Sequence, residues 1–488
     1  MTRSPIRRAT AIWLTLALGF LALAVIRFRS AEARDRQPVD SQQSSSAVTA
    51  FVGVTVLPMD TDRLLENQTV VVRDGRIASV GPAASTSVPS DAVRIDGRGK
   101  FLMPGLAEMH AHVLGSQAQN SEELNRDIMF LYVANGITTI RAMLGAPNQL
   151  VLRDQLNRGE VLGPTMYVAA PSLNGNTAPD AQSAERLVRA HKEAGYDLLK
   201  IHPGMNRAAY DAMVQTAREV GITWGGHVSG QIGVEHILDT KQSTIDHIDG
   251  YVEAAVSNEL KQAMASGTQV PPAQAWRSVT DERMRALARR TKEVGTWNVP
   301  TMFLWESFYG PGTPEEWSTR GELKYAPKQW VTNWGNQRRQ RIQQDAQAGI
   351  AAADAALFLS LRRKMLKFLG DEGAPLLMGT DSPQMFNVPG FALHRELAVA
   401  VAAGLTPWQV LKSGSKNVGL YVAHDLKQDG RFGTVTVGGR ADLVLLDANP
   451  LQDVANLATR SGVMVKGRWV PREEIDRGLA ALAARYAQ

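Results

Sequence analysis

The chain has 488 residues, of which 44% are hydrophobic and 21% are charged, and it contains no cysteine. This length suits a barrel domain of about 250 to 400 residues with a small second domain, and the composition is typical of a globular protein. The lack of cysteine excludes disulfides, thiolate metal sites and a cysteine nucleophile.

The formal net charge of +5 arises in the N-terminal segment. Residues 1–36 hold seven arginines against Glu32 and Asp35, so acidic and basic side chains are equal in number over the rest of the chain. A nucleic-acid-binding protein would need a basic patch on its folded part. We therefore expect no nucleic acid among the partners.

Residues 1–36 have the pattern of a signal peptide or a membrane anchor. Basic residues precede an apolar run over residues 11–26, and Ala31 and Ala33 offer a cleavage site. The arginines between the run and that site disfavour cleavage, so a membrane tether through the run is an alternative, and a buried cytosolic helix is a third. The Ser/Gln-rich residues 37–47 predict a linker. We expect a periplasmic or secreted protein.

Residues 48–103 and 425–488 both predict short strands. Apolar and polar residues alternate there in brief stretches, and turn residues such as Asp74-Gly75 separate them. Two β-rich ends around a long α/β middle predict a small β-sandwich domain that is built from both ends of the chain.

Residues 104–424 alternate between strand-like and helix-like segments. The candidate strands are residues 105–112, 137–143, 165–170, 198–202, 223–228, 243–248, 296–303 and 376–380. Amphipathic stretches such as residues 181–194 and 207–220 predict helices between them. Strands that alternate with helices in this way favour an α/β fold of the (β/α)8 TIM-barrel type.

A long insertion, residues 304–374, separates the last two candidate strands. Its first part, residues 305–334, is rich in tryptophan, tyrosine and phenylalanine. A connection that leaves the carboxyl end of a barrel strand starts at the face where barrel active sites lie. The insertion therefore predicts an aromatic lid over a substrate. The alternative is an aromatic cluster that packs the insertion's own helices or a contact between subunits of a homo-oligomer.

His110-Ala111-His112, at the end of the first candidate strand, is the sharpest chemical signal. Residues two apart on a strand point to one face, so the two imidazoles can bind one metal ion. A hydrogen-bonded histidine pair is the alternative. Further candidate ligands at the carboxyl ends of other strands are Lys200, His227, His247 and Asp381. Since these ends converge in a barrel, we expect the six side chains to form one metal site.

Three other residues are candidates for contacts with a substrate. His202 shares a strand face with Lys200, and His394 lies in a predicted helix just past the last strand. Arg141, at the end of the second strand, would meet a substrate carboxylate or form a structural ion pair.

Several motifs together resemble the amidohydrolase superfamily, over nearly the whole chain after the leader. The matching strings are residues 71–77, 103–106, 108–112, 433–435 and 438–447. Within the superfamily the chain looks like the branch of imidazolonepropionase-like enzymes and Xaa-Pro dipeptidases. Relatives commonly carry an aspartate directly after the arginine that stands here as Arg141, whereas this chain has alanine. A substrate contact made by that aspartate is therefore not expected.

The resemblance implies a binuclear metal centre. His110 and His112 would bind the more buried ion, and His227 and His247 would bind the second. Lys200, carbamylated by carbon dioxide, would bridge both ions. Imidazole, carboxylate and carbamate ligands suit Zn²⁺, and also manganese, iron or cobalt.

The resemblance also implies a reaction, the cleavage of a C–N amide bond in a dipeptide or an N-acyl amino acid by metal-activated hydroxide. Asp381 would touch the buried ion and act as the catalytic base and then as the acid. The same chemistry would serve a cyclic amide, a carbamate or an ester. An inactive, membrane-tethered binding protein is a hypothesis of another class, and it predicts the loss of one or more ligands.

Overall fold

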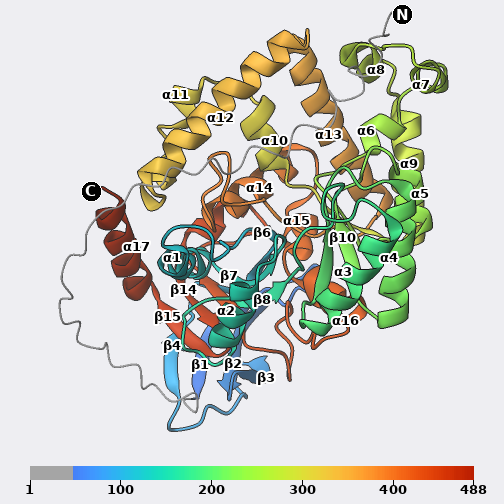
Figure 1. Cartoon of the computed structure of the whole chain (residues 1–488). Coiled ribbons are helices and arrows are strands. Elements are labelled where there is room, and N and C mark those ends of the chain that lie inside the picture. The colour runs from blue at the N-terminus through green and yellow to red at the C-terminus, as the bar shows by residue number, and fades with distance from the viewer. Residues whose placement is uncertain (1–47, 488) are drawn as a thin grey trace, which may run out of the picture.

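The computed structural model describes residues 48–487, in which β strands from both ends adjoin an α/β central part (Figure 1). The predicted leader, tether and linker, residues 1–47, lie outside the described residues. Within residues 48–487, no helix has the length and apolar character needed to span a membrane.

Strands from both ends of the chain are joined in one sheet. The N-terminal strands are β1 (Thr49–Val56), β2 (Leu65–Arg73), β3 (Arg76–Pro82), β4 (Val93–Asp96) and β5 (Phe101–Pro104), and the C-terminal strands are β13 (Leu443–Leu446), β14 (Arg460–Val465) and β15 (Arg468–Pro471). The order is β15-β14-β13-β5-β1-β2-β3, with β4 beside β1. The two ends meet where β5 pairs antiparallel with β13.

The hairpin between β2 and β3 shows how the sequence sets this sheet. Asp74 and Gly75 both have positive φ, 50° and 72°, as the two central residues of a type I′ hairpin turn require. The turn places Arg73 opposite Arg76. Valines of β2 then face a core that includes Phe51 and Leu443.

Two parallel sheets make up the central part. One holds β6 (Leu106–Ala111), β7 (Ile137–Ala142) and β8 (Thr165–Val168), and the other holds β9 (Leu198–Ile201), β10 (Thr223–Gly226), β11 (Thr244–Asp246) and β12 (Trp297–Val299). An isolated parallel bridge between Ala169 and Leu198 connects the sheets. On the opposite side, residues 376–382 bridge β12 through Leu376 and β6 through Ser382.

Helices follow most of these strands. They are α1 (Ser121–Ala134), α2 (Pro147–Asn157), α3 (Ala181–Glu193), α4 (Arg207–Val220), α5 (Val234–Asp239), α6 (Tyr251–Ala254), α7 (Asn258–Ala265), α8 (Pro272–Arg277), α9 (Asp281–Val294), α14 (Phe391–Ala402), α15 (Pro407–Ser413) and α16 (Lys416–His424). The bounds of α4 show the local causes. The Asn206 side chain accepts a hydrogen bond from the Ala209 N–H at its start, and Gly221, at φ 66°, ends it.

Two candidate strands differ from the prediction by more than small shifts of their ends. The seventh, residues 296–303, is too long, because β12 ends at Val299 and a helix begins at Met302. Thr301 adopts a left-handed conformation there, with φ 48°, which turns the chain out of the strand. The eighth, residues 376–380, pairs with its neighbours through isolated bridges and is not a continuous strand.

The insertion, residues 304–374, is largely helical. It contains α10 (Met302–Tyr309), α11 (Pro314–Trp317), the 3-10 helix η1 (Gly321–Tyr325), α12 (Lys328–Gln347) and α13 (Ala352–Glu372). In Figure 1, α11 and α12 lie at the periphery of the molecule. Phe303, Trp317 and Trp334 pack in one cluster with Phe386 and with Leu482 of the C-terminal helix α17 (Arg472–Ala487). This packing favours the interpretation of the aromatic residues as a structural cluster.

Candidate metal centre

His110 and His112 meet Asp381 at the end of β6. The Nε2 atom of His112 hydrogen-bonds with Oδ1 of Asp381, and Nε2 of His110 lies 3.6 Å from the same oxygen. The backbone N–H of Asp381 also donates to the carbonyl oxygen of His110, at 2.8 Å. Asp381 is thus fixed beside both imidazoles by main-chain and side-chain contacts.

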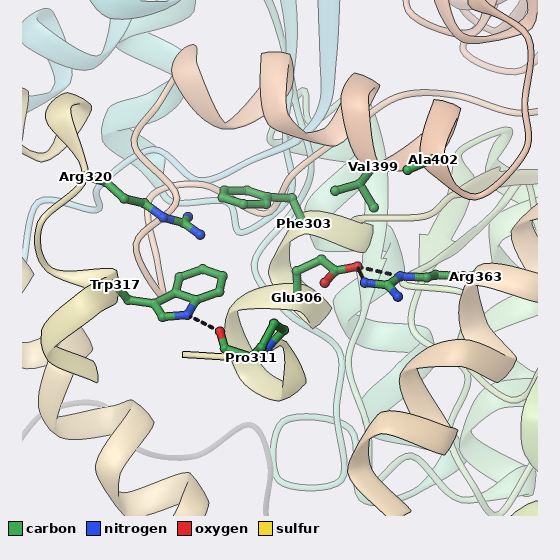
Figure 2. Close-up of a pocket in the computed structure, with 8 residues that line it drawn as sticks. All are labelled: Phe303, Glu306, Pro311, Trp317, Arg320, Arg363, Val399 and Ala402. Atoms are coloured by element: carbon green, nitrogen blue, oxygen red, sulfur yellow. Dashed lines mark hydrogen bonds and ion pairs between the residues drawn. The ribbon is translucent and has the colours of Figure 1, made fainter. Parts of the chain in front are cut away.

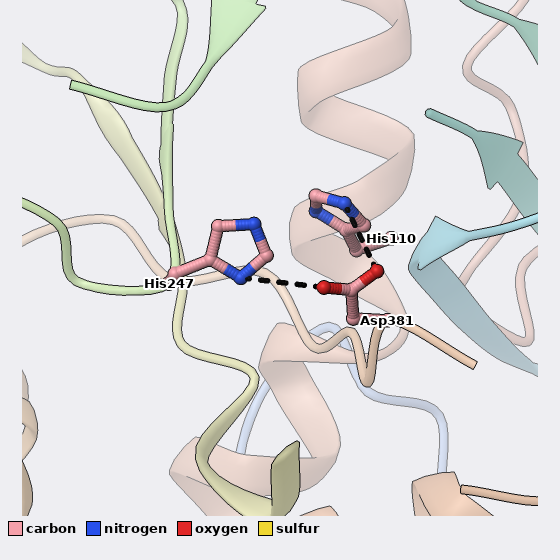
Figure 3. Close-up of side chains that lie close together, drawn as sticks. All are labelled: His110, His247 and Asp381. Carbon is pink, nitrogen blue, oxygen red and sulfur yellow. Dashed lines mark ion pairs between the residues drawn. The ribbon is translucent and has the colours of Figure 1, made fainter. Parts of the chain in front are cut away.

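His247, just past β11, completes the inner part of the cluster. Its Nδ1 atom lies 3.8 Å from Oδ2 of Asp381, and its ring centroid lies 4.5 Å from that of His110. Figure 3 shows the Asp381 carboxylate between the two histidines. One ligand atom from each of His110, His247 and Asp381 lies within 4.8 Å of the others, which is a spacing that can hold a metal ion.

Lys200 and His227 lie against this inner cluster. The Nζ atom of Lys200 is 3.3 Å from Nε2 of His110, and its side chain is fully buried. The ring of His227 is 4.4 Å from that of His247 between centroids, and its Nδ1 atom hydrogen-bonds with Oδ2 of Asp249 at 2.7 Å. The structure therefore brings all six predicted ligands into one cluster.

An unpaired ligand atom and the chemistry of the side chains both suit a cation in this cluster. Among residues 48–487, Nε2 of His247 is buried and has no hydrogen-bond partner. Buried polar groups in proteins are almost always paired, so this nitrogen needs an explanation. Imidazole nitrogens and a carboxylate are the donor set that zinc and similar divalent ions prefer.

The charges of the cluster support an ionised Asp381. Burial alone would raise the pKa of its carboxyl group, but the nearby His110 and His112 outweigh this and hold that pKa below its ordinary value. Burial lowers the pKa of the Lys200 amine, and the adjacent Asp246 opposes that shift.

The backbone is unusual at the same place. His247, Ile248, Thr301 and Asp381 all have φ between 48° and 65°, a left-handed conformation that residues other than glycine rarely adopt. Residues in such conformations concentrate at functional sites, where the surrounding structure holds them.

Several supporting residues were not predicted. Glu108 accepts hydrogen bonds from the backbone N–H of His110 at 2.9 Å and from the N–H and Oγ1 of Thr380 at 2.8 and 2.6 Å. It therefore ties β6 to the segment before Asp381. Asp246 lies 3.0 Å from Nδ1 of His110 through Oδ2. The available signal was an acidic residue one or two positions before a candidate ligand.

The three candidate substrate residues lie in different surroundings. His202 is at the edge of the cluster, with its ring centroid 5.0 Å from that of His227 and its Nδ1 atom 2.6 Å from Oγ of Ser172. Arg141 is fully buried and binds Oδ1 of Asp246 at 3.2 Å and the Tyr421 hydroxyl at 3.0 Å. These contacts favour the structural ion pair over a substrate contact.

His394 contacts residues outside the cluster. Its Nε2 atom lies 2.9 Å from the carbonyl oxygen of Asn135 and 3.3 Å from Nη1 of Arg460. Burial, with the help of the Arg460 charge, lowers the pKa of His394 to about 3. This placement between α1, α14 and β14 favours a structural role.

Comparison with known proteins identifies relatives along most of the chain. A family model described as "Amidohydrolase family" matches residues 101–470. An imidazolonepropionase from Rubrobacter xylanophilus is 26% identical over 413 residues, which cover 78% of this chain and 84% of the relative. An imidazolonepropionase from Stenotrophomonas maltophilia is 30% identical over 153 residues, which cover 29% of this chain and only 37% of that relative.

Solved structures share the fold. A bottromycin amidohydrolase superposes with a TM-score of 0.68 at 22% identity, covering 91% of both chains. A Xaa-Pro dipeptidase with bound methionine superposes with a TM-score of 0.62 at 18% identity, covering 87% of this chain and all of the other. These likenesses indicate a TIM-barrel-like α/β fold.

Proposed function

This chain belongs to the amidohydrolase family, and we propose that it is a metal-dependent hydrolase of carbon–nitrogen bonds in small amide substrates. The observation that carries the proposal is the meeting of Asp381 with His110, His112 and His247, where Nε2 of His247 is buried and unpaired among the described residues. The imidazolonepropionase and dipeptidase names of the relatives agree with a C–N bond as the target.

The proposed architecture is a (β/α)8 barrel over residues 104–424, with a β sandwich formed by residues 48–103 and 425–488. The bridges of Ala169 with Leu198, Asn298 with Leu376 and Ala111 with Ser382 support a closed ring of parallel strands. In such a ring the ligands lie at or just beyond the carboxyl ends of the strands, where barrel enzymes have their active sites.

We propose that His110, His112 and Asp381 hold one divalent ion and that His227 and His247 hold a second, with carbamylated Lys200 between them. Zn²⁺ is the proposed ion, and manganese, iron and cobalt share the ligand preference. A divalent ion bound there supplies an electrophile that polarises the substrate carbonyl and lowers the pKa of water.

The proposed role of Asp381 is to move a proton. As a carboxylate it accepts the proton of the attacking water through one oxygen and then returns it to the nitrogen of the leaving amine. The main-chain bond from the Asp381 N–H to the carbonyl oxygen of His110 holds the backbone of Asp381 beside the cluster before the substrate binds.

The proposed substrate is a dipeptide or an N-acyl amino acid. A cyclic amide is the second candidate. The relative from R. xylanophilus, whose match covers 78% of this chain, is named for an imidazolone, which is a cyclic amide. We also propose that the protein is exported, on the evidence of the apolar run over residues 11–26 that follows basic residues.

Metal content of the full chain, purified without chelator, tests the proposal. We expect about two ions per chain, fewer in His110→Ala, and hydrolysis of dipeptides or N-acyl amino acids by the wild type. Lys200→Ala should lose metal and activity and regain part of both with short carboxylates. Asp381→Asn should lower turnover by orders of magnitude. No metal and no hydrolysis, even after zinc and bicarbonate are supplied, would refute the proposal.

A further inference from the structure

A pocket of about 420 Å³ lies outside the metal cluster and shares no residue with it. It opens between α10, α14 and the segment that joins α11 to η1. Figure 2 shows Phe303 and Trp317 on two sides of the pocket, Arg320 at one end and the Glu306–Arg363 pair at the other. Val399 of α14 adds an aliphatic surface.

In the part of the chain that the structure describes, two arginines around this pocket pair with glutamates, whereas Arg320 does not. Arg363 donates from Nε to Oε1 of Glu306 at 2.7 Å, and Arg395 donates from Nε to Oε1 of Glu322 at 2.6 Å. By contrast, Nη1 of Arg320 is buried and has no hydrogen-bond partner among residues 48–487. Burial and the charge of Arg395 lower the pKa of Arg320 to about 10, although the charge of Glu322 opposes them, so the guanidinium still carries its charge at neutral pH.

Aromatic rings lie against this guanidinium. The Cζ atom of Arg320 lies 3.6 Å from the ring centroid of Trp317 and 5.0 Å from that of Phe303. On the same indole, Cζ of Arg338 lies 4.7 Å from the centroid. A guanidinium held against aromatic rings loses little freedom when it donates to a carboxylate.

The pocket therefore combines the charge of Arg320 and the Glu306–Arg363 pair with apolar walls. Arg320 lines the pocket and forms no salt bridge among residues 48–487, so an anion that enters the pocket would supply its counter-charge. Rings and an aliphatic side chain around one charged group are the usual lining of a site for a small organic ligand.

We propose that this pocket binds a small aromatic carboxylate, with the carboxylate on Arg320 and the ring against Phe303, Trp317 and Val399. The ligand would bind independently of the metal centre, because the lining of the pocket includes none of the candidate metal ligands.

Isothermal titration of the full chain with phenylacetate tests this site, with 2-phenylethanol as the neutral analogue. We expect the wild type to bind phenylacetate and to bind the alcohol at least tenfold more weakly. Arg320→Gln should weaken phenylacetate binding at least tenfold. The matched control is Arg339→Gln, an exposed arginine paired with Glu315 on the neighbouring helix, and it should bind as the wild type does.

Thermal unfolding provides a second readout on the same proteins. Phenylacetate should raise the unfolding midpoint of the wild type and of Arg339→Gln, but not that of Arg320→Gln. His110→Ala should bind phenylacetate as the wild type does. Binding that is unchanged in Arg320→Gln, binding that is lost in His110→Ala, or no binding to the wild type would each overturn the proposal.

Discussion

At the scale of single residues, two of the candidate ligands are each held by a second side chain. Oγ1 of Thr301 lies 2.8 Å from Nδ1 of His247, and Oδ2 of Asp249 lies 2.7 Å from Nδ1 of His227. Such a contact fixes the tautomer and the orientation of an imidazole, so that its other nitrogen is free to bind a metal ion. The metal affinity of the proposed centre therefore depends also on Thr301 and Asp249, which would not contact the metal ions themselves.

Thr301 gives a test of this dependence. Thr301→Val keeps the shape of the side chain but removes the oxygen that orients His247. We expect metal affinity to fall by about 10- to 100-fold, measured by competition with a chromogenic chelator, while the circular dichroism spectrum stays unchanged. Thr301→Ser restores the hydroxyl and should recover most of the affinity. Equal affinities in the valine and wild-type proteins would show that the contact does not position His247.

His394 makes stability depend on pH. Its pKa is about 3 in the folded protein, against 6.5 in an unfolded chain, so between these values the unfolded state binds more protons. Stability should therefore fall as the pH falls from about 7 to about 4. The glutamine amide of the His394→Gln variant can still donate to the Asn135 carbonyl but does not titrate. This contribution to the pH dependence of the free energy of unfolding should therefore disappear in the variant. Urea unfolding of both proteins from about pH 7 to about pH 4 measures this dependence. If the free energy of unfolding falls equally with pH in both proteins, His394 is not its cause.

The sequence was more informative about the ligands than about their supports. His110, His227 and Asp381 are rare residue types at the ends of apolar strands, so they can be recognised as candidate ligands from the sequence alone. Thr301 and Glu108 belong to types that occur everywhere, and each acts through a partner that is 54 or 272 positions away. Such contacts emerge only when the strands have been arranged in space.

At the scale of elements, the start of α10 is the feature that the sequence concealed. Residues 296–303 are apolar enough to extend the strand, but the chain turns at Thr301 and α10 begins at Met302. The cause is Glu396 of α14, whose carboxyl oxygens accept the backbone N–H groups of Met302 and Phe303 at 2.8 and 2.6 Å. A cap supplied by another helix has no local signature.

Glu396 should therefore matter for both stability and metal binding. Burial raises its pKa to about 8, although the two N–H groups oppose the shift. Glu396→Ala leaves two buried donors unpaired, so we expect a loss of about 1 to 3 kcal/mol in the free energy of unfolding and weaker metal binding, since α10 follows Thr301. Glu396→Gln retains an acceptor and should lose less.

Denaturant unfolding and metal titration of these variants test the cap. Glu293→Ala, an exposed glutamate on α9, is the control for the loss of a carboxylate and should resemble the wild type. A Glu396→Ala protein with the stability and metal affinity of this control would show that α10 starts without help from α14.

At the scale of the whole molecule, the chain ends are held against the central part. Arg440 donates to Oγ1 of Thr139 at 2.9 Å, and Arg460 donates to the carbonyl oxygen of Ala134 at 2.9 Å. That both ends contribute to one β region could be predicted, because each end shows the same alternation of apolar and polar residues. The pairing of β5 with β13 could not be predicted, since it joins residues more than 300 positions apart.

The C-terminal helix α17 gives the last prediction, because it closes the aromatic cluster of the insertion. Leu482 is buried in that cluster, and the neighbouring Tyr486 hydroxyl donates to Asp127 of α1 at 2.6 Å. Leu482→Asp places a charge among aromatic rings and should lower the free energy of unfolding by at least about 3 kcal/mol. Ala481→Asp, one exposed position away, should cost no more than about 1 kcal/mol.

Substrate preference in Leu482→Asp then separates the two interpretations of the insertion. If the aromatic residues only pack α10, α12 and α17 together, the folded fraction of the variant should retain the wild-type order of preference among dipeptides and N-acyl amino acids. If they form a lid, loosening α17 should change KM most for substrates with bulky apolar groups. The packing of Trp317 and Trp334 against Phe386 leads us to expect the first result.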